Sequence, residues 1–363
     1  MAPVAAALRT YAPKVETRVA LTGQHTTLVD QVLTAFDLDR HYDLGIMKEE
    51  QTLYDLVHGA VDGLREVVTE FRPDIILVQG DTATVFTASL VGFFERVSVG
   101  HVEAGLRSGD KNAPFPEEVF RRLTDVISDF YFAPTGRSRD LLLAENVPAD
   151  AIYVTGNTVV DALIEVGAQN RPITNEQLRS VVLDTSRRLV LLTAHRRESF
   201  GAPMRELFAG VRSLADQVED IEIVYPVHPN PNVLEPASEL LSGHPRIHLT
   251  EPLDYFDLVA ALRAASLVLT DSGGIQEEAP TFGTPVLVLR EVTERPEGID
   301  AGVAELVGTD ATKLIARGLQ ALSADGGSCA SNPYGDGRAG MRIADIVVSS
   351  LTGVARSTQD WNQ

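Results

Sequence analysis

The chain has 363 residues, 44% of them hydrophobic, which is enough to bury the cores of two α/β domains. Its 51 acidic side chains outnumber the 31 basic ones, and the net charge of -20 disfavours nucleic acids and anionic membranes as partners. A single cysteine excludes an intrachain disulfide, and without a long apolar run or a signal peptide we expect a cytoplasmic protein.

In the first half of the chain, short apolar runs alternate with amphipathic helical stretches, which is typical of parallel βαβ units. The predicted strands are 18–22, 74–79, 97–100, 129–133 and 152–155. Between two of them, apolar residues recur at helical spacing from Leu53 to Val68, and Pro73 closes this helix. The chain opens on a helical pattern at 2–9, so the usual first strand of a wound sheet is expected to be missing.

A second series of strands follows a polar stretch at 170–186. These strands are predicted at 189–193, 221–225, 246–249, 266–270 and 285–289. Two wound sheets without an internal repeat predict two Rossmann-like domains, with boundaries at 1–165 and 166–336. The cleft between such domains is the expected site, because ligands bind at the carboxyl ends of parallel strands.

Carboxylates follow the strands of the first domain. Asp81 comes directly after a strongly apolar strand, where it is either a helix N-cap or a functional group. Glu103 follows the next strand, and Glu117 and Glu118 stand at a helix start, where they also satisfy free N–H groups. Several carboxylates at one sheet edge are hard to explain as caps alone, so we expect a catalytic group here.

The second domain carries candidates for binding an anion. His195, followed by Arg196 and Arg197, ends a strand and concentrates positive charge in an acidic chain. The turn Ser272-Gly273-Gly274 offers a hydroxyl and open N–H groups to a phosphate. Farther along, Glu278 is an acceptor for ribose hydroxyls and Arg295 is a forked donor. Together they predict a nucleotide-diphosphate site.

These motifs resemble those of the non-hydrolysing UDP-N-acetylglucosamine 2-epimerases, over nearly the whole chain. The motifs are Thr-Gly-Gln-His at 22–25, Gly-Asp-Thr at 80–82, the segment 101–107, Pro-Glu-Glu at 116–118, Thr-Gly-Asn-Thr at 155–158, the segment 193–198, Tyr-Pro-Val-His at 225–228, the segment 270–278 and Ser-Asn-Pro-Tyr-Gly-Asp-Gly at 331–337. The resemblance implies a GT-B-like α/β fold whose C-terminal helix, at 337–354, returns to the first domain. It also implies a homodimer, and neither a redox cofactor nor a metal ion.

The activity implied by the resemblance is the conversion of UDP-GlcNAc to UDP-ManNAc, through loss and return of UDP and a 2-acetamidoglucal intermediate. The implied catalytic residues are Asp81, Glu103, Glu117 and His195. The implied UDP-binding residues are Ser272, Gly273, Gly274, Glu278 and Arg295. Which carboxylate serves which face of the sugar is left open.

The chain departs from the family pattern in two places. The first strand and the cationic loop after it are missing, and because such a strand is usually buried on both faces we expect a start placed about 15–20 residues late. A second, activating nucleotide-sugar site would use Gln24, His25, Arg196 and His228. Thr27 and Glu50 replace an expected glutamine and arginine there, so we expect weak activation and hyperbolic kinetics.

Three other functions remain open from the sequence. A hydrolysing epimerase would release free ManNAc and UDP, differing only in the capture of the intermediate by water. A GT-B glycosyltransferase would share the architecture but would need an acceptor site that the sequence does not reveal. A non-catalytic nucleotide-sugar binder is the alternative from another class, because the cationic loop is missing.

Overall fold

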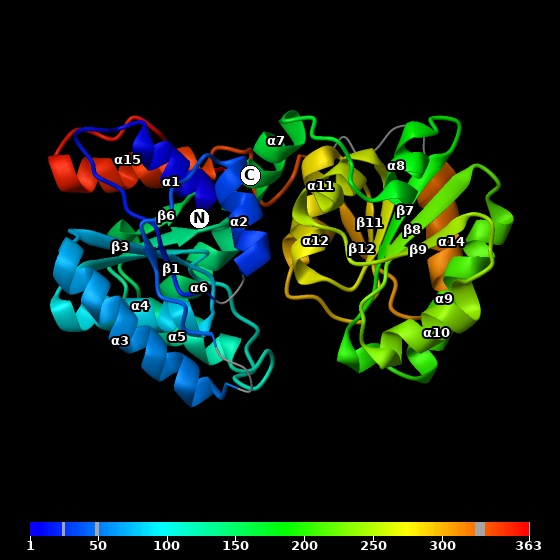
Figure 1. The fold of residues 1–363 in the computed structure, drawn as a ribbon, viewed down its shortest axis with the longest axis horizontal. Coiled ribbons are helices and arrows are strands. Elements are labelled where there is room, and N and C mark those ends of the chain that lie inside the picture. The colour runs from blue at the N-terminus through cyan, green and yellow to red at the C-terminus, as the bar shows by residue number, and fades with distance from the viewer. Residues whose placement is uncertain (24–25, 48–50, 324–330, 363) are drawn as a thin grey trace. The chain divides into compact units, whose positions relative to one another are not determined.

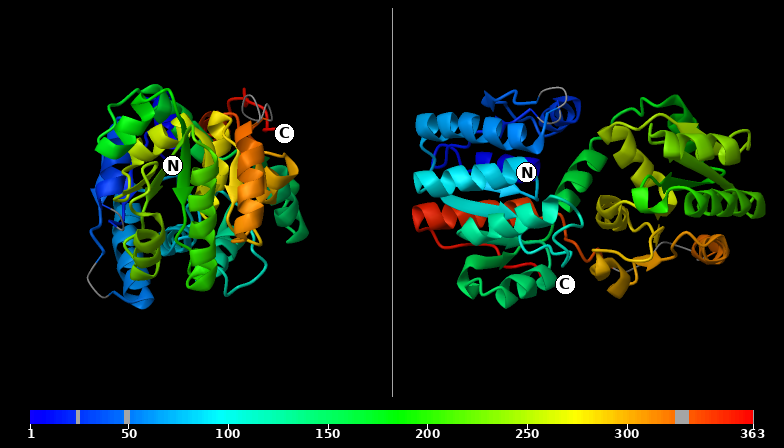
Figure 2. Two further views of the ribbon diagram at one scale, coloured as in Figure 1. Left: turned by 90° about the vertical axis from the view of Figure 1, so that its right-hand side faces the viewer. Right: turned by 90° about the horizontal axis from the view of Figure 1, so that it is seen from below.

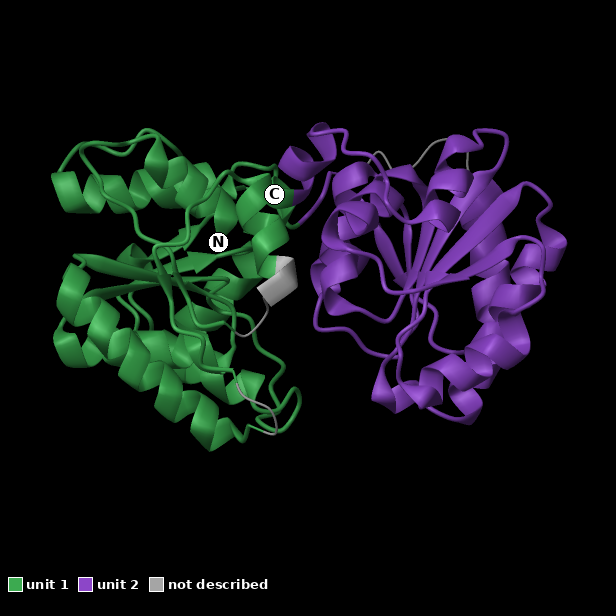
Figure 3. Ribbon diagram, viewed as in Figure 1, with its two compact units in different colours: residues 1–162, 334–363 green, residues 163–333 purple. Residues whose placement is uncertain are grey.

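The computed structural model describes residues 1–23, 26–47, 51–323 and 331–362. The chain divides into two units (Figure 3). Unit 1 combines residues 1–162 with 334–363, and unit 2 is the continuous segment 163–333. Unit 1 is therefore built from both ends of the chain.

The sheet of unit 1 has four parallel strands in chain order. These strands are β3 (Ile75–Gln79), β4 (Ser98–Val102), β5 (Phe130–Ala133) and β6 (Ile152–Val154). Two short strands, β1 (Ala20–Leu21) and β2 (Tyr42–Asp43), form a separate parallel pair. All four strands of the larger sheet end on the same edge, so the residues that follow them are neighbours.

Helices cover both faces of this sheet. The helices of unit 1 are α1 (Ala2–Arg9), α2 (Thr26–Ala35), α3 (Leu53–Phe71), α4 (Ala83–Glu95), α5 (Glu117–Ile127), α6 (Gly136–Ala144), α15 (Ala339–Thr352) and the start of α7 (Thr158–Ala168), with a short 3₁₀ turn, η1, at Ala149–Ala151. Helices α1 and α15 lie side by side, and Val4 and Ile343 pack with Phe132 of the sheet (Figure 1). Helices α3 and α4 cover the other face through Leu64, Val85 and other apolar side chains.

Unit 2 holds a six-stranded parallel sheet in the order β12-β11-β10-β7-β8-β9. The strands are β7 (Arg188–Thr193), β8 (Ile221–Pro226), β9 (Ile247–Thr250), β10 (Ala265–Thr270), β11 (Val286–Val288) and β12 (Ala304–Leu306). This is the doubly wound order, and the direction of winding reverses between β7 and β10. The carboxyl ends of these two strands are the place where such sheets bind ligands.

The helices of unit 2 shield its long apolar strands. They are α8 (Glu176–Leu183), α9 (Ala202–Gln217), α10 (Pro231–Leu241), α11 (Tyr255–Ala264), α12 (Gly273–Glu278), α13 (Pro296–Asp300) and α14 (Ala311–Ser323), with 3₁₀ turns η2 (Arg197–Ser199) and η3 (Ala279–Phe282). Helices α9, α10 and α14 bury Phe208, Val233 and Leu314 against the sheet. Figure 2 shows α14, in orange, running alongside the strands.

The α/β fold class is as predicted, and every predicted strand overlaps an observed one. Strands β2 and β12 were not predicted from the sequence. The polar stretch 170–186 is not a simple linker, because α8 lies within it and buries Leu178 and Val181. No helix in the described part of the chain is long and apolar enough to span a membrane.

Candidate active site

Asp81 lies at the carboxyl end of β3 and is held by a cation. Gly80, with φ of +83°, turns the chain out of the strand. Thr82, and not Asp81, caps helix α4, since its hydroxyl accepts the N–H of Val85 at 3.4 Å. The N-cap interpretation of Asp81 is therefore wrong. Its Oδ2 instead accepts from the Arg121 guanidinium on α5, with Nε at 3.1 Å.

Arg121 also connects Asp81 to Glu118. The Glu118 carboxylate is fully buried and accepts the N–H groups of Ser108 at 3.0 Å and Gly109 at 3.3 Å. It also accepts Nη1 of Arg121 at 3.0 Å. With three donors on a buried carboxylate, Glu118 fastens the 108–109 loop to α5 and is not available to a substrate.

Glu103 follows β4 in a conformation that few side chains adopt. Its φ is +67°, a left-handed conformation that costs a non-glycine residue about 1–2 kcal/mol. Oε1 accepts from the Asn157 amide at 3.1 Å, and Oε2 accepts from the Gln79 amide at 3.2 Å. A Cβ placed on Gly80 would lie 3.5 Å from Oε2. The strained backbone thus places the Glu103 carboxylate over the turn that leads into Asp81.

Glu117 is the first residue of α5. Its Oε2 is buried and has no hydrogen-bond partner among the described residues. A buried carboxylate oxygen without a donor is unfavourable, and a proton or a bound hydroxyl would relieve it. No hydrogen bond within the described residues joins Glu117 to Asp81 or Glu103. The structure thus places Glu103 beside Gly80, the residue before Asp81, and places Glu117 on the helix whose Arg121 holds Asp81.

In unit 2, the ends of β7 and β10 are tied together by one buried carboxylate. Asp271 is 1% exposed, and its Oδ2 accepts the backbone N–H groups of His195 at 2.6 Å and Arg196 at 2.7 Å. The Arg196 Nε also donates to the Asp271 carbonyl at 3.3 Å. These bonds fix the His195 segment beside the turn that begins at Ser272.

The His195 ring lies between two ionisable neighbours. It stacks on His228 with ring centroids 5.5 Å apart and planes inclined by 13°. Its Nδ1 lies 3.6 Å from Oδ1 of Asp271, an oxygen that is otherwise without a hydrogen bond in the described structure. Burial lowers the pKa of His195; Asp271 opposes the shift, while Arg196 and His228 add to it. A lowered pKa keeps the ring neutral near pH 7, with one N–H to donate.

All five residues predicted to hold the nucleotide lie together around the start of α12. Ser272 precedes the helix and its hydroxyl makes no capping bond. A Cβ on Gly273 would lie 3.8 Å from the Arg295 guanidinium carbon, and one on Gly274 would lie 3.6 Å from Oε1 of Glu278. Both glycines therefore lie within van der Waals reach of the side chains predicted to bind the nucleotide.

Glu278 is an unusual carboxyl group at this site. Burial raises its pKa from 4.5 to about 7, and the negative charge of Glu277 adds to this shift. Glu277 itself forms an ion pair with Arg295. Near neutral pH, Glu278 can therefore either donate or accept a hydrogen bond.

Comparison with known proteins identifies the family to which the chain belongs. The family model described as UDP-N-acetylglucosamine 2-epimerase matches residues 7–348. A Bacillus subtilis UDP-N-acetylglucosamine 2-epimerase is 46% identical over 350 residues, which cover 95% of this chain and 90% of the relative. A Salmonella typhimurium enzyme of the same name is 44% identical over 359 residues, covering 96% and 95%. This chain belongs to the UDP-N-acetylglucosamine 2-epimerase family.

A solved structure agrees with this family assignment. The crystal structure of the Neisseria meningitidis UDP-GlcNAc 2-epimerase bound to UDP-GlcNAc matches with a TM-score of 0.83 and 38% identity. The match covers 97% of this chain and 96% of the Neisseria chain. The prediction of the epimerase family from sequence motifs is confirmed.

Three residues of this epimerase-family site were not singled out from the sequence, namely Arg121, Asn157 and Asp271. Each lies inside or next to a motif, but its role depends on a partner far away in the chain. Of the predicted second site, Gln24 and His25 lie outside the described residues, as does Glu50, whereas Arg196 and His228 lie next to His195. The described residues contain no cluster of His, Cys, Asp and Glu that could hold a metal ion.

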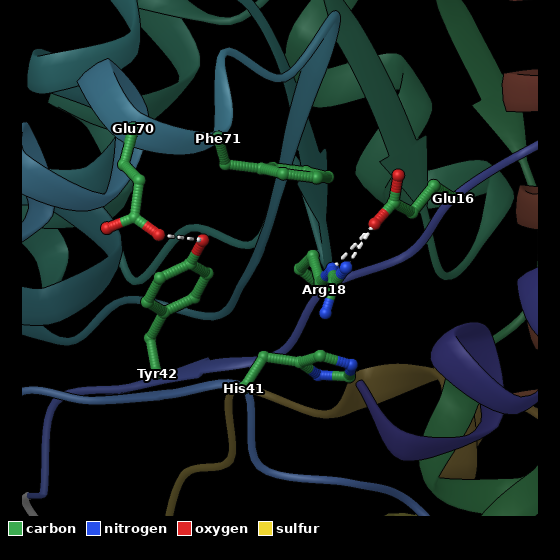
Figure 4. Close-up of a pocket in the computed structure, with 6 residues that line it drawn as sticks. All are labelled: Glu16, Arg18, His41, Tyr42, Glu70 and Phe71. Carbon is green, nitrogen blue, oxygen red and sulfur yellow. Dashed lines mark hydrogen bonds and ion pairs between the residues drawn. The ribbon is translucent and has the colours of Figure 1, made fainter.

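A cavity of about 440 Å³ lies elsewhere in unit 1 (Figure 4). Its lining residues are Glu16, Arg18, His41, Tyr42, Glu70 and Phe71. The Tyr42 hydroxyl donates to Glu70 at 3.2 Å, and the Arg18 guanidinium lies 5.9 Å from the Phe71 ring centroid. The cavity is at the amino ends of β1 and β2, and none of the site residues predicted for this epimerase-family chain lines it.

Proposed function

We propose that the chain interconverts UDP-GlcNAc and UDP-ManNAc by inverting carbon 2 of the sugar. The observation that carries the proposal is that the family match, over residues 7–348, runs through both units and includes both side-chain clusters. The relatives in the match are named for this reaction, and one was solved with UDP-GlcNAc bound.

The proposed route begins with elimination. A carboxylate removes the proton on carbon 2, the electrons of that C–H bond form a double bond to carbon 1, and the C1–O bond breaks with its electron pair going to UDP. The product is 2-acetamidoglucal. UDP then returns to carbon 1 while a second acid delivers a proton to the other face of carbon 2. Loss of the diphosphate makes removal of this weakly acidic proton feasible at neutral pH.

The carboxylates of unit 1 suit different parts of this route. Asp81 is paired with Arg121, so protonating it would break an ion pair, and it is suited to stabilising positive charge on the sugar. Glu117 has a buried oxygen without a partner in the described structure, which suits proton transfer. Glu103 is held by two amides over the Asp81 turn and is the second proton-transfer candidate.

The unit 2 cluster suits the departing nucleotide. A neutral His195 ring can donate a hydrogen bond to the diphosphate as negative charge develops on it. Ser272 and the two glycines after it offer a hydroxyl and the first N–H groups of α12, and Arg295 offers a forked cation to the UDP portion. Glu278 would accept hydrogen bonds from the ribose hydroxyls. From the family resemblance we also propose that the chain is cytoplasmic and forms a homodimer. Sedimentation of the pure chain would test the dimer.

The proposal is tested by proton NMR of UDP-GlcNAc incubated with the chain in deuterium oxide. The expected result is UDP-ManNAc carrying deuterium at carbon 2, together with deuterium in the remaining UDP-GlcNAc. Release of free ManNAc and UDP would instead identify a hydrolysing epimerase. Binding of UDP without exchange at carbon 2 would identify a non-catalytic nucleotide-sugar binder and overturn the proposal.

A further inference from the structure

His101 is a buried histidine on β4 that the proposed route does not use. Its side chain has no exposure to solvent. Nδ1 lies 2.6 Å from Oδ1 of Asp125, and Nε2 lies 2.8 Å from the carbonyl oxygen of Gly80. Both ring nitrogens therefore face oxygen atoms at hydrogen-bond distance.

The partners of Asp125 show that it is an acceptor. Its Oδ2 accepts the N–H of Gly105 at 3.3 Å and lies 2.7 Å from Nη2 of Arg107. An aspartate that already receives these donors is a carboxylate, so the proton in its bond with His101 belongs to Nδ1. A backbone carbonyl has no proton to give, so Nε2 must also carry one. A ring with protons on both nitrogens is an imidazolium.

Two other described histidines, His41 and His244, lack this arrangement. Nδ1 accepts a backbone N–H in His41, from Val19 at 3.1 Å, and in His244, from Arg246 at 3.2 Å. A nitrogen that accepts cannot carry a proton, so these rings are neutral in this structure. His244 is a close match for His101, because it is also buried and has an aspartate, Asp216, 3.1 Å from its other nitrogen.

The charged groups around His101 favour the cation. Burial by itself lowers the pKa of His101, but the charge and hydrogen bond of Asp125, the Gly80 carbonyl and the charge of Glu103 raise it, and the net shift is upward. Asp125 faces the ring from α5, and Glu103 faces it from the end of β4. The Arg107 cation lies beyond Asp125 and is itself balanced by Glu145, with Nε and Nη2 at 2.9 and 2.7 Å.

We propose that His101 is a positioning residue that carries a constant positive charge and fastens the ends of β3 and β4 in the geometry that catalysis needs. Its two bonds join the Gly80 carbonyl, one residue before Asp81, to Asp125 on the helix that also carries Glu117. Glu103 follows His101 by two residues. A charge-assisted bond at each nitrogen thus holds the segments that present all three carboxylates. The catalytic part of this inference rests on the proposed function.

The charge is tested by NMR of the chain labelled with ¹⁵N-histidine, at about pH 8, where an unperturbed histidine is neutral. The expected spectrum has one ring with protons on both nitrogens, and this signal is lost in His101→Gln. The His244 ring, assigned with His244→Gln, should have one bare nitrogen. A bare nitrogen on His101 would overturn the inference whether or not the chain is an epimerase.

The positioning role is tested with Asp125→Asn, which keeps the size of the side chain but removes the charge that stabilises the imidazolium. We expect kcat of this variant to be lower than that of the wild type by about 10²-fold at about pH 8 and to recover as the pH is lowered, with KM changing much less. The wild type and His244→Gln should not lose activity in this way. A pH profile of Asp125→Asn parallel to that of the wild type would overturn the role.

The variant His101→Gln gives a second check, because both N–H groups of glutamine are on one nitrogen and cannot replace donors at the two separate ring nitrogens. It should lower kcat by about 10²-fold relative to His244→Gln at every pH, since no proton can restore the lost bond. Equal kcat values for the two variants would contradict a positioning role. If the wild type itself does not exchange the proton on carbon 2, the proposed function fails, and the NMR result alone still decides the charge of His101.

Discussion

Glu103 shows how a single residue can combine strain with function. Its positive φ is costly, and two amides from β3 and the segment after β6 hold its carboxylate in place. Non-glycine residues in such conformations cluster where geometry matters more than stability. The positive φ of Glu103 therefore supports its proposed role in proton transfer.

We predict that Glu103→Gln lowers the rate of deuterium exchange at carbon 2 by about 10²- to 10⁴-fold, because an amide cannot accept the proton. The fold should persist, since glutamine has the same shape, and the melting temperature should change little. Glu70→Gln is the control, because Glu70 is also a carboxylate of unit 1 that accepts a side-chain hydrogen bond, from Tyr42 at 3.2 Å, but it lies outside the candidate site. An exchange rate in Glu103→Gln equal to that of the control would contradict the role.

Glu278 makes the stability of the chain depend on pH. Its pKa of about 7 lies above the usual 4.5, so the folded state keeps a proton that the unfolded chain releases between these values. This contribution to stability is present at low pH and is lost as the pH rises through that window. We expect Glu278→Gln, which cannot ionise, to gain about 2 kcal/mol relative to the wild type between about pH 5 and about pH 8. Urea unfolding at both pH values measures the difference, and an equal difference at both would refute it.

Sequence patterns could locate the individual carboxylates but not the groups that hold them. Asp81 and Glu103 were predicted at strand ends because a strand, a turn and a helix are encoded locally. Their partners are not local: Arg121 is 40 residues from Asp81, and Asn157 is 54 residues from Glu103. Such pairings depend on the order of strands in the sheet, which hydrophobic periodicity does not specify.

Among the secondary-structure elements, the ends of two neighbouring strands are joined by the Asp271 carboxylate. It closes the β7 and β10 ends by accepting two backbone N–H groups of the His195 segment. Asp257, on α11, also accepts two backbone N–H groups. Its side chain is buried, with 2% of the residue exposed, and the donors are Thr174 at 2.9 Å and Asn175 at 2.7 Å. Asp271 lies next to the residues predicted to bind the nucleotide, whereas Asp257 joins α11 to the segment just before α8.

We predict that Asp271→Ala and Asp257→Ala destabilise the chain to a similar degree, by about 2–4 kcal/mol, since each leaves two partly buried N–H groups without their acceptor. Only Asp271→Ala should also weaken the binding of UDP, because it releases His195 beside the Ser272 turn. Calorimetric titration with UDP under conditions where both variants are folded separates the effects. Equal loss of UDP affinity in both would show that Asp271 acts through general stability.

Two short strands, β2 and β12, were not predicted from the sequence. They have two and three residues, too few to form a pattern by themselves, whereas the equally short β1, β6 and β11 lie within longer apolar runs. Helix α8 was not predicted either, because the polar residues on its surface obscure the helical spacing of Leu178 and Val181. Long buried strands such as β7 and β10 were predicted within one residue at each end, since both of their faces are covered by helices.

At the scale of the whole molecule, the net charge of -20 opposes the folded state through self-repulsion. We expect the melting temperature to rise with sodium chloride between about 0.05 M and about 0.5 M, because the screening length falls well below the size of the molecule. Sucrose at matched osmolality is the control for changes in water activity, and it should not reproduce the same dependence on concentration. A melting temperature that falls steadily with salt would show that attractive ion pairs dominate.

The division of unit 1 between the two ends of the chain has a consequence for how the protein is made. A ribosome completes residues 163–333 before it reaches α15, so the whole of unit 2 emerges while unit 1 still lacks the helix that packs against Val4 and Leu8. Domains generally fold as units during synthesis, in the order in which their residues become available. Here the order is reversed: residues 1–162 are translated before unit 2, but their unit can be completed only after it, and the apolar surface of Val4 and Leu8 stays uncovered until α15 has been made.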